Sequence, residues 1–219
     1  MLGKLGPAAA TEAVLSRLTE CLCDPHWNVR SSAAEVLGEL GPTAAKEAVL
    51  NRLTECLRDP HQIVRTSVAQ TLGKLGSAAA TETALSRLTE CLHDPDIKVR
   101  SSAARALGEL GPTAATEAVL NRLTESLRDP GWTVQSNAAA ALGKLGPAAA
   151  TEAALSRLTE WLRDPNRIVR STAGRAFGDL LKAGVRWFPP REGWLRISTV
   201  SELSDEVERL TKPFARRPE

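Results

Sequence analysis

The chain has 219 residues, of which 42% are hydrophobic, 25% charged and 4% aromatic, and its formal net charge is +2. This weak positive charge does not indicate a protein that binds nucleic acid or an anionic membrane through its bulk charge. No apolar stretch approaches the roughly 20 residues that span a bilayer, and the first residues lack the pattern of a signal peptide. Four cysteines in a chain of this length do not make a disulfide framework, so we expect reduced thiols and a cytoplasmic protein.

A unit of 35 residues is repeated five times and accounts for most of the chain. The first copy recurs with few changes, and the five copies are Leu2–Val36, Leu37–Thr71, Leu72–Ala106, Leu107–Ala141 and Leu142–Ala176. Near-identical copies at a fixed period are typical of an array in which stacked neighbours share one core. We therefore expect a repeat array over residues 1–180 and a separate C-terminal segment over residues 181–219.

The first half of each unit has the pattern of an amphipathic helix. In the first unit the apolar residues fall at helical spacing, at Leu15, Leu18 and Leu22. Thr11 is a suitable N-cap because its hydroxyl can accept a hydrogen bond from a free amide, although Pro7 could open the helix a turn earlier. The pair Asp24-Pro25 ends this helix, and the proline stands where a second helix can begin.

The second half of each unit also predicts a helix. Its apolar stripe in the first unit consists of Val29, Ala33, Leu37 and Leu40. Gly41 supplies the C-terminal stop. Two helices cannot bury their apolar faces alone, so the sequence predicts an all-α fold, an α-solenoid of about five stacked helix pairs.

A sequence block in each unit resembles HEAT repeats, especially the short bacterial HEAT-like kind. The block is Leu-Arg-Asp-Pro-x-x-x-Val-Arg-x-x-Ala-Ala-x-x-Leu-Gly-x-Leu, and in the second unit it runs from Leu57 to Leu75. The resemblance covers residues 2 to about 180 and implies two-helix repeats whose second helices line the concave surface. HEAT-like arrays occur in binding scaffolds, in phycobilin lyase-type proteins and at the sensor ends of bacterial signalling ATPases. Among these roles the resemblance points to the sensor end of a larger signalling protein, and the chain itself contains no P-loop.

The aspartate and the arginine of this block lie six residues apart and recur along the array. We expect them to form a structural ladder in which each guanidinium bridges carboxylates or helix-end groups of neighbouring units. The ladder residues are Asp24, Arg30, Asp59, Arg65, Asp94, Arg100, Asp129, Asp164 and Arg170. In the fourth unit Gln135 replaces the arginine, so that rung loses a charge.

Differences between the units concentrate in the second helix, at positions spaced i, i+4 and i+7 that share one face. We call this face the variable face and expect it to bind a partner through Trp27, Asn28, Glu35, Gln62, Ile63, Gln70, Ile97, Lys98, Arg105, Trp132, Thr133, Asn137, Arg167, Ile168 and Arg175. The i+4 row within this face is Ser32, Ser67, Ser102, Asn137 and Thr172.

Neutral drift at exposed positions is one explanation of this variation. Drift would also scatter the first helix, yet that helix keeps four residues in every unit, which in the first unit are Glu12, Arg17, Thr19 and Glu20. Tryptophan and arginine, which the variable face gains, are residues that often anchor interfaces. We therefore expect a non-catalytic scaffold that binds a protein or peptide, such as the recognition part of a larger signalling protein.

The sequence is also compatible with two other functions. One is a structural or oligomerising spacer. The other is a solenoid that grips a nucleic-acid backbone through Lys98, Arg105, Arg167 and Arg175, which Glu35 and the apolar members of the face disfavour. Nothing in the sequence indicates an enzyme or a cofactor. Nor does it indicate a metal site, because the compact group of Cys21, Cys23 and His26 lacks zinc spacing and a fourth ligand.

The two ends of the array differ. After Leu181 the repeat stops, and we expect a C-terminal cap made of a small β-hairpin over residues 185–197, a last helix over residues 201–211 and a frayed tail. At the other end Leu2–Leu5 reads as the tail of a second helix without its beginning. Such an uncapped edge indicates either a piece of a longer array or self-association through this end.

Overall fold

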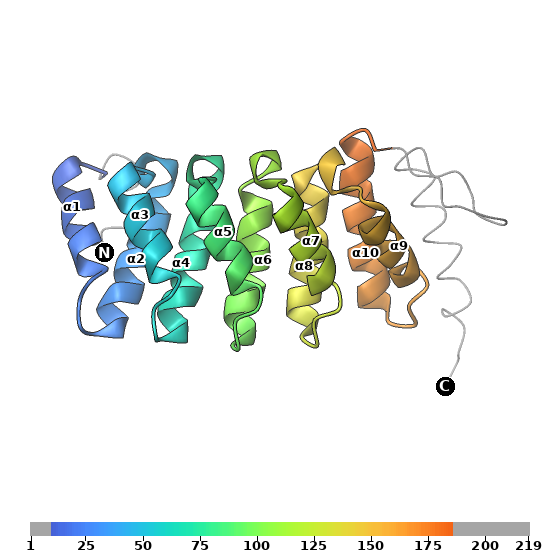
Figure 1. The fold of residues 1–219 in the computed structure, drawn as a ribbon, viewed down its shortest axis with the longest axis horizontal. Helices are drawn as coiled ribbons and strands as arrows, with labels where there is room; N and C mark the ends of the chain where they lie inside the picture. Colours follow the sequence, from blue (N-terminus) through green and yellow to red (C-terminus); the bar gives the residue numbers. More distant parts are fainter. Residues whose placement is uncertain (1–9, 186–219) are drawn as a thin grey trace.

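The computed structural model describes residues 10–185, which form two layers of helices stacked side by side (Figure 1). The first helices of the five repeats are α1 Glu12–Cys21, α3 Glu47–Cys56, α5 Glu82–Cys91, α7 Glu117–Ser126 and α9 Glu152–Trp161. The second helices are α2 Trp27–Leu40, α4 Gln62–Leu75, α6 Ile97–Glu109, α8 Trp132–Leu145 and α10 Arg167–Lys182. No strand occurs within residues 10–185, so the predicted all-α solenoid of five helix pairs is confirmed there.

Short 3₁₀ turns join each second helix to the next first helix. They are η3 Gly41–Ala44, η4 Gly76–Ala79, η5 Pro112–Ala114 and η6 Pro147–Ala149. A glycine with positive φ, such as Gly41 at +66°, ends each of the second helices α2, α4, α6 and α8 or lies just beyond its end, and this confirms the predicted stop. The start of the first helix is confirmed as well, because the Thr11 hydroxyl accepts from the amide of Val14.

The core lies between the two layers and runs without interruption from α1 to α10. The predicted stripe of the first helix is buried at Leu15, Leu18 and Leu22. On the second helix Leu37 and Leu40 are fully buried, whereas Val29 is only half-buried. Every interior repeat buries the residue equivalent to Val29 completely, namely Val64, Val99 and Val134.

Both predicted end structures fall on residues that the structure does not describe. The expected hairpin and last helix lie outside the described residues except for Val185, and the expected N-terminal edge lies within residues 1–9. The helix α10 itself continues to Lys182, so the described part of the array ends where the repeat pattern in the sequence stops.

Candidate binding surface

The turn between the two helices of a repeat is organised by its aspartate. In the first repeat the carboxylate of Asp24 accepts a hydrogen bond from the amide of His26, 2.8 Å away, and Asp59 accepts in the same way from His61. These bonds hold two residues outside the helix, so α2 begins at Trp27, two residues after Pro25 and not at the proline. The side chains at the start of each second helix are therefore presented at the edge of the array.

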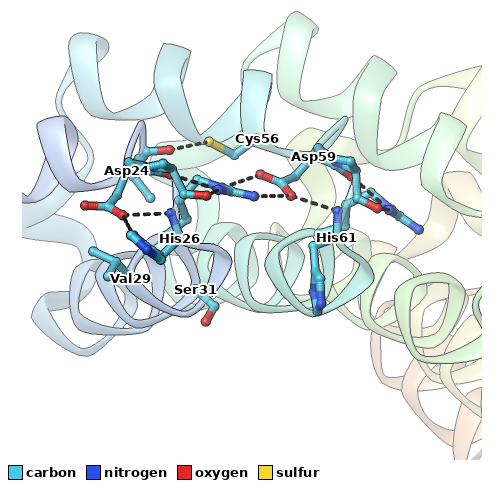
Figure 2. A network of polar contacts seen from close by, with 12 residues as sticks. Asp24, His26, Val29, Ser31, Cys56, Asp59 and His61 are labelled. Carbon is cyan, nitrogen blue, oxygen red and sulfur yellow. Dashed lines mark hydrogen bonds and ion pairs between the residues drawn. The ribbon is translucent and has the colours of Figure 1, made fainter.

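Three arginines of the ladder bind the aspartate of the following repeat. The guanidinium of Arg30 donates two bonds to the carboxylate of Asp59, from Nε at 2.6 Å and from Nη2 at 2.8 Å (Figure 2). Its third nitrogen, Nη1, donates to the backbone carbonyl of Asp24, six residues earlier in the chain. The same arrangement recurs between Arg65 and Asp94 and between Arg100 and Asp129.

The paired arginine and aspartate side chains of these rungs are mostly buried, and each stabilises the charged form of the other. The side chains of Arg30 and Asp59 are only 13% and 7% exposed. Burial on its own would raise the pKa of the Asp59 carboxyl, but the hydrogen bonds from Arg30 and from the His61 amide outweigh burial and lower that pKa below its ordinary value. The hydrogen bond to Asp59 likewise raises the pKa of Arg30. Paired charges of this kind act as inter-repeat links and are unsuited to proton transfer.

The rung between the fourth and fifth repeats is different. Gln135 keeps the bond to its own turn, since its Nε2 donates to the carbonyl of Asp129 at 2.7 Å. A neutral amide cannot supply the two-pronged guanidinium contact that Asp164 would need in order to match the other rungs. The fifth repeat retains its own turn, in which Arg170 donates to the carbonyl of Asp164.

One large apolar side chain per repeat is exposed at the start of the second helix. The exposed fractions are 41% for Trp27, 40% for Ile63, 42% for Ile97, 38% for Trp132 and 58% for Ile168. We call these five residues the anchor row. All five belong to the predicted binding set, and they are the large hydrophobic residues that are exposed among residues 10–185.

Neighbouring repeats support the anchor row from one side. The ring of Trp27 stacks on the imidazole of His61 with ring centroids 4.2 Å apart and planes 1° apart. At the equivalent position of the fourth repeat the chain has Gly131, and a Cβ there would collide with the side chain of Ile97. In these two places the residue before a second helix packs against, or makes room for, the anchor of the repeat before it.

The other predicted positions divide into exposed and engaged residues. Asn28, Gln62, Lys98, Thr133 and Arg167 are exposed beside the anchor row, and Arg105 and Arg175 are exposed at the i+7 position. Three predicted residues bond to a neighbouring repeat, and of these Glu35 is also exposed whereas Gln70 and Asn137 are half-buried. The carboxylate of Glu35 accepts from the Ser67 hydroxyl, the Gln70 amide donates to Ser102, and the Asn137 amide donates to Ser101.

The i+4 row does not lie at the surface in the way that we expected. Ser67, Ser102 and Thr172 are buried and Asn137 is half-buried, so only Ser32 of this row is exposed. The physical reason is that the second helices approach one another closely. At the closest approach a Cβ added to Gly108 would lie 2.7 Å from the Cα of Ala141.

Glycines in the Leu-Gly-x-Leu block create this close contact, which the sequence reasoning missed. Each faces a small residue 33 positions later in the next repeat, in the pairs Gly38 and Thr71, Gly73 and Ala106, Gly108 and Ala141, and Gly143 and Ala176. That constant offset was the available signal. The hydroxyl of Thr71 also donates to the carbonyl of Ala34 on the preceding helix.

The first helices are spaced more widely. Open grooves lie between α1 and α3, with a volume of about 870 Å³, and between α5 and α7, with about 550 Å³. The second helices pack directly against one another along the whole array. The second helices therefore form the more closely packed of the two layers.

The candidate reactive groups among the described residues take part in packing and hydrogen bonding within the array. The thiols of Cys56 and Cys91 lie against the carbonyls of Leu22 and Leu57, and burial raises their pKa to about 11 and about 12. They are therefore protonated and unreactive at neutral pH. Between residues 10 and 185 no group of three or more His, Cys, Asp or Glu side chains is placed to hold a metal ion. No described helix has the length and apolar character to cross a membrane.

The stacked helix pairs, the shared core and the inter-repeat rungs define an α-solenoid repeat protein. The sequence matches the family described as HEAT repeats over residues 15–95 and 85–178. The chain belongs to the HEAT repeat family, as the resemblance of its repeat block predicted. None of the curated proteins matches the sequence.

Solved structures with the same fold are distant in sequence. An engineered protein is 22% identical, with 94% of this chain and 97% of that chain covered and a TM-score of 0.68. An archaeal HEAT-like repeats protein from Thermococcus onnurineus is 17% identical, with 100% and 85% covered and a TM-score of 0.60. A designed armadillo repeat protein in complex with the peptide (KR)4 is 19% identical, with 93% and 100% covered and a TM-score of 0.63.

Proposed function

We propose that this protein is a non-catalytic scaffold that binds a protein or peptide along the variable face of its second helices. The observation that carries the proposal is the anchor row, in which each of the five repeats exposes one large apolar side chain at the same edge. A row of exposed apolar groups rimmed by polar residues is typical of an interaction site. Tryptophan, which occurs twice in the row, is also enriched among residues that dominate binding energy.

Two further points support this proposal. The designed armadillo repeat protein in complex with the peptide (KR)4 illustrates that a protein of similar fold can bind a peptide. The buried, protonated thiols of Cys56 and Cys91 suit a compartment that keeps cysteines reduced, and we propose the cytoplasm. The polar clusters among residues 10–185 are rungs and turns whose groups bond one another, so we assign no catalytic step to them.

Selection from a random peptide library displayed on phage tests the proposal. The full chain is the target, and the selected peptides are then measured against two triple variants. One variant removes anchors, as Trp27→Ala, Ile97→Ala and Trp132→Ala. The control removes exposed carboxylates of the first helices, as Glu20→Ala, Glu55→Ala and Glu125→Ala.

We expect the anchor variant to bind the selected peptides at least about tenfold more weakly, because each anchor contributes more than about 1 kcal/mol at a well-packed interface. The control variant should bind as the unchanged protein does, and thermal unfolding should show that both variants fold. Equal binding by the two variants would contradict the proposal. So would the recovery of no peptide together with salt-sensitive binding of duplex DNA, which is the behaviour of a nucleic-acid clamp.

A further inference from the structure

The first two residues of every second helix form a mixed pair. In each repeat one of them is a large apolar anchor and the other is polar or cationic. The pairs are Trp27 with Asn28, Gln62 with Ile63, Ile97 with Lys98, Trp132 with Thr133, and Arg167 with Ile168. A partner that runs along the array therefore meets one apolar contact and one polar contact at each repeat.

The spacing of the repeats limits the conformation of such a partner. Packed helices lie roughly 8–10 Å apart, so equivalent residues of successive repeats are separated by about the same distance. A polyproline II segment rises about 3.1 Å per residue and has three residues per turn, which brings every third side chain to the same side at intervals of about 9 Å. One apolar residue at every third position of an extended segment would match the anchor row.

The charges beside the anchor row are mainly positive. Lys98 and Arg167 lie next to anchors, and Arg105 and Arg175 lie further along the same helices. Of the carboxylates nearby, Glu35 already accepts a bond from the Ser67 hydroxyl, and Asp96, just before Ile97, accepts from the amides of Lys98 and Val99. The charges therefore favour carboxylates on the partner, facing the third and fifth repeats.

The opposite ends of the second helices do not change this balance. Their last turns carry charges of alternating sign from repeat to repeat, at Glu39, Lys74, Glu109, Lys144 and Asp179. Arg105 lies 3.9 Å from Glu109, and Lys182 lies 3.7 Å from Asp179. These weak, exposed pairs leave the cationic character near the anchors largely intact.

Building on the proposed function, we propose that the partner is an extended acidic peptide segment with an apolar residue at about every third position. Its apolar side chains pack on the anchor row. Its carboxylates bind Lys98 and Arg167 beside the anchors and Arg105 and Arg175 roughly two turns further along the same helices. Five anchors correspond to a segment of about 13 residues at three residues per repeat.

Three synthetic peptides of 13 residues test this inference by fluorescence anisotropy with the full chain. The first has leucine at positions 1, 4, 7, 10 and 13 with glutamate and serine between them. The second replaces glutamate by lysine, and the third keeps the first composition but places the five leucines together. We expect the first peptide to bind at least about tenfold more tightly than either of the others, with an affinity that falls as salt screens the charges.

A matched pair of charge-reversal variants locates the contact. Lys98→Glu with Arg167→Glu should weaken binding of the first peptide at least about tenfold. Both substitutions place an acid at a helix N-terminus, where the helix dipole favours it, so the variant should fold. Arg17→Glu with Arg52→Glu, on exposed positions of the first helices, should change the affinity by less than about twofold.

The outcomes separate this inference from the proposed function. Tighter binding of the lysine peptide, or no binding of the first peptide at 0.1 mM protein, would overturn the proposal that the partner is an acidic peptide segment. The proposed function would still stand if phage-selected peptides depended on the anchors. Equal weakening by the two charge-reversal variants would show that the first peptide does not bind at the variable face and would also overturn the inference.

Discussion

Most polar contacts of the first helices stay within one helix, although the thiols of Cys56 and Cys91 reach the preceding repeat. In every first helix an arginine binds a glutamate three residues later, as Arg17 binds Glu20, with distances between 2.6 and 2.9 Å along the array. The threonine between them donates its hydroxyl to a carbonyl of the same helix, as Thr19 does to Leu15. The second helices instead make contacts that reach the next repeat, through the arginine rungs and the glycines that allow close approach.

This comparison shows where the repeats are free to differ. The conserved threonine is half-buried or buried in all five repeats, so its constancy has a structural reason. The conserved arginine and the conserved glutamate three residues after it form the same local ion pair at the surface of each copy. On the second helices the buried contacts stay similar, whereas the exposed anchor row and its neighbours vary. The repeats therefore differ from one another mainly at the exposed side chains of the second helices.

Breaking a rung should have the largest effect on stability. We expect Arg65→Ala to lower the free energy of unfolding by about 3 kcal/mol, since it leaves the mostly buried carboxylate of Asp94 without its guanidinium. Urea denaturation measures this change. The matched control is Arg122→Ala, which removes an exposed pair with Glu125 on a first helix and should cost no more than about 0.5 kcal/mol. Equal costs would contradict the contrast between the layers.

A substitution at the contact between second helices should come next. We expect Gly108→Val to destabilise the protein by about 2 kcal/mol, because a side chain there meets the backbone of Ala141 and must push α6 and α8 apart. Ser86→Val, at an exposed position of the first helix α5, provides a β-branched control with little expected effect. A Gly108→Val protein as stable as its control would mean that the second helices are not closely packed.

The natural gap in the ladder offers a stabilising test. Gln135→Arg restores a guanidinium at the fourth repeat and should let it bind Asp164 in the way that Arg100 binds Asp129. We expect a gain of about 1 kcal/mol in the free energy of unfolding. An unchanged or lower urea midpoint would show that the rungs do not link neighbouring repeats in the manner described.

Much of the fold could be predicted from the sequence, and the remainder depended on distances between repeats. The 35-residue period, the Thr11 cap and the Gly41 stop gave the helix pairs, since these signals are local. A spacing of six residues between aspartate and arginine could not tell which carboxylate the guanidinium reaches. The carboxylate belongs to the next repeat, because Nε and Nη2 of Arg30 bind Asp59 while its Nη1 binds the backbone carbonyls of its own turn.

The candidate surface was predicted less completely for a similar reason. Helical spacing placed the anchor row and the i+4 row on one face, but it could not show that close packing buries Ser67 and Ser102. Nor could it show that Glu35 and Gln70 would be bonded to the serines of the next repeat. Exposure at such positions depends on the distance between helices, which the constant glycine offset would have indicated.

Acidification should have the smallest effect and should act through the same rungs. The pKa of Asp59 is lowered in the folded protein, so its ion pair stabilises the fold above the unfolded pKa, near 4, and that contribution is lost as the pH falls through the folded pKa. We expect the unchanged protein to lose more stability between pH 6 and pH 3 than Asp59→Asn does. Parallel pH profiles of urea midpoints for the two proteins would contradict this role.

Hydroxyl-radical footprinting of the full chain, with and without a phage-selected peptide, tests the central claim most directly. The account predicts that the bound peptide lowers the oxidation of Trp27, Ile97 and Trp132 while segments of the first helices react as before. Protection confined to the first helices, with the three anchors oxidised equally in both samples, would contradict it.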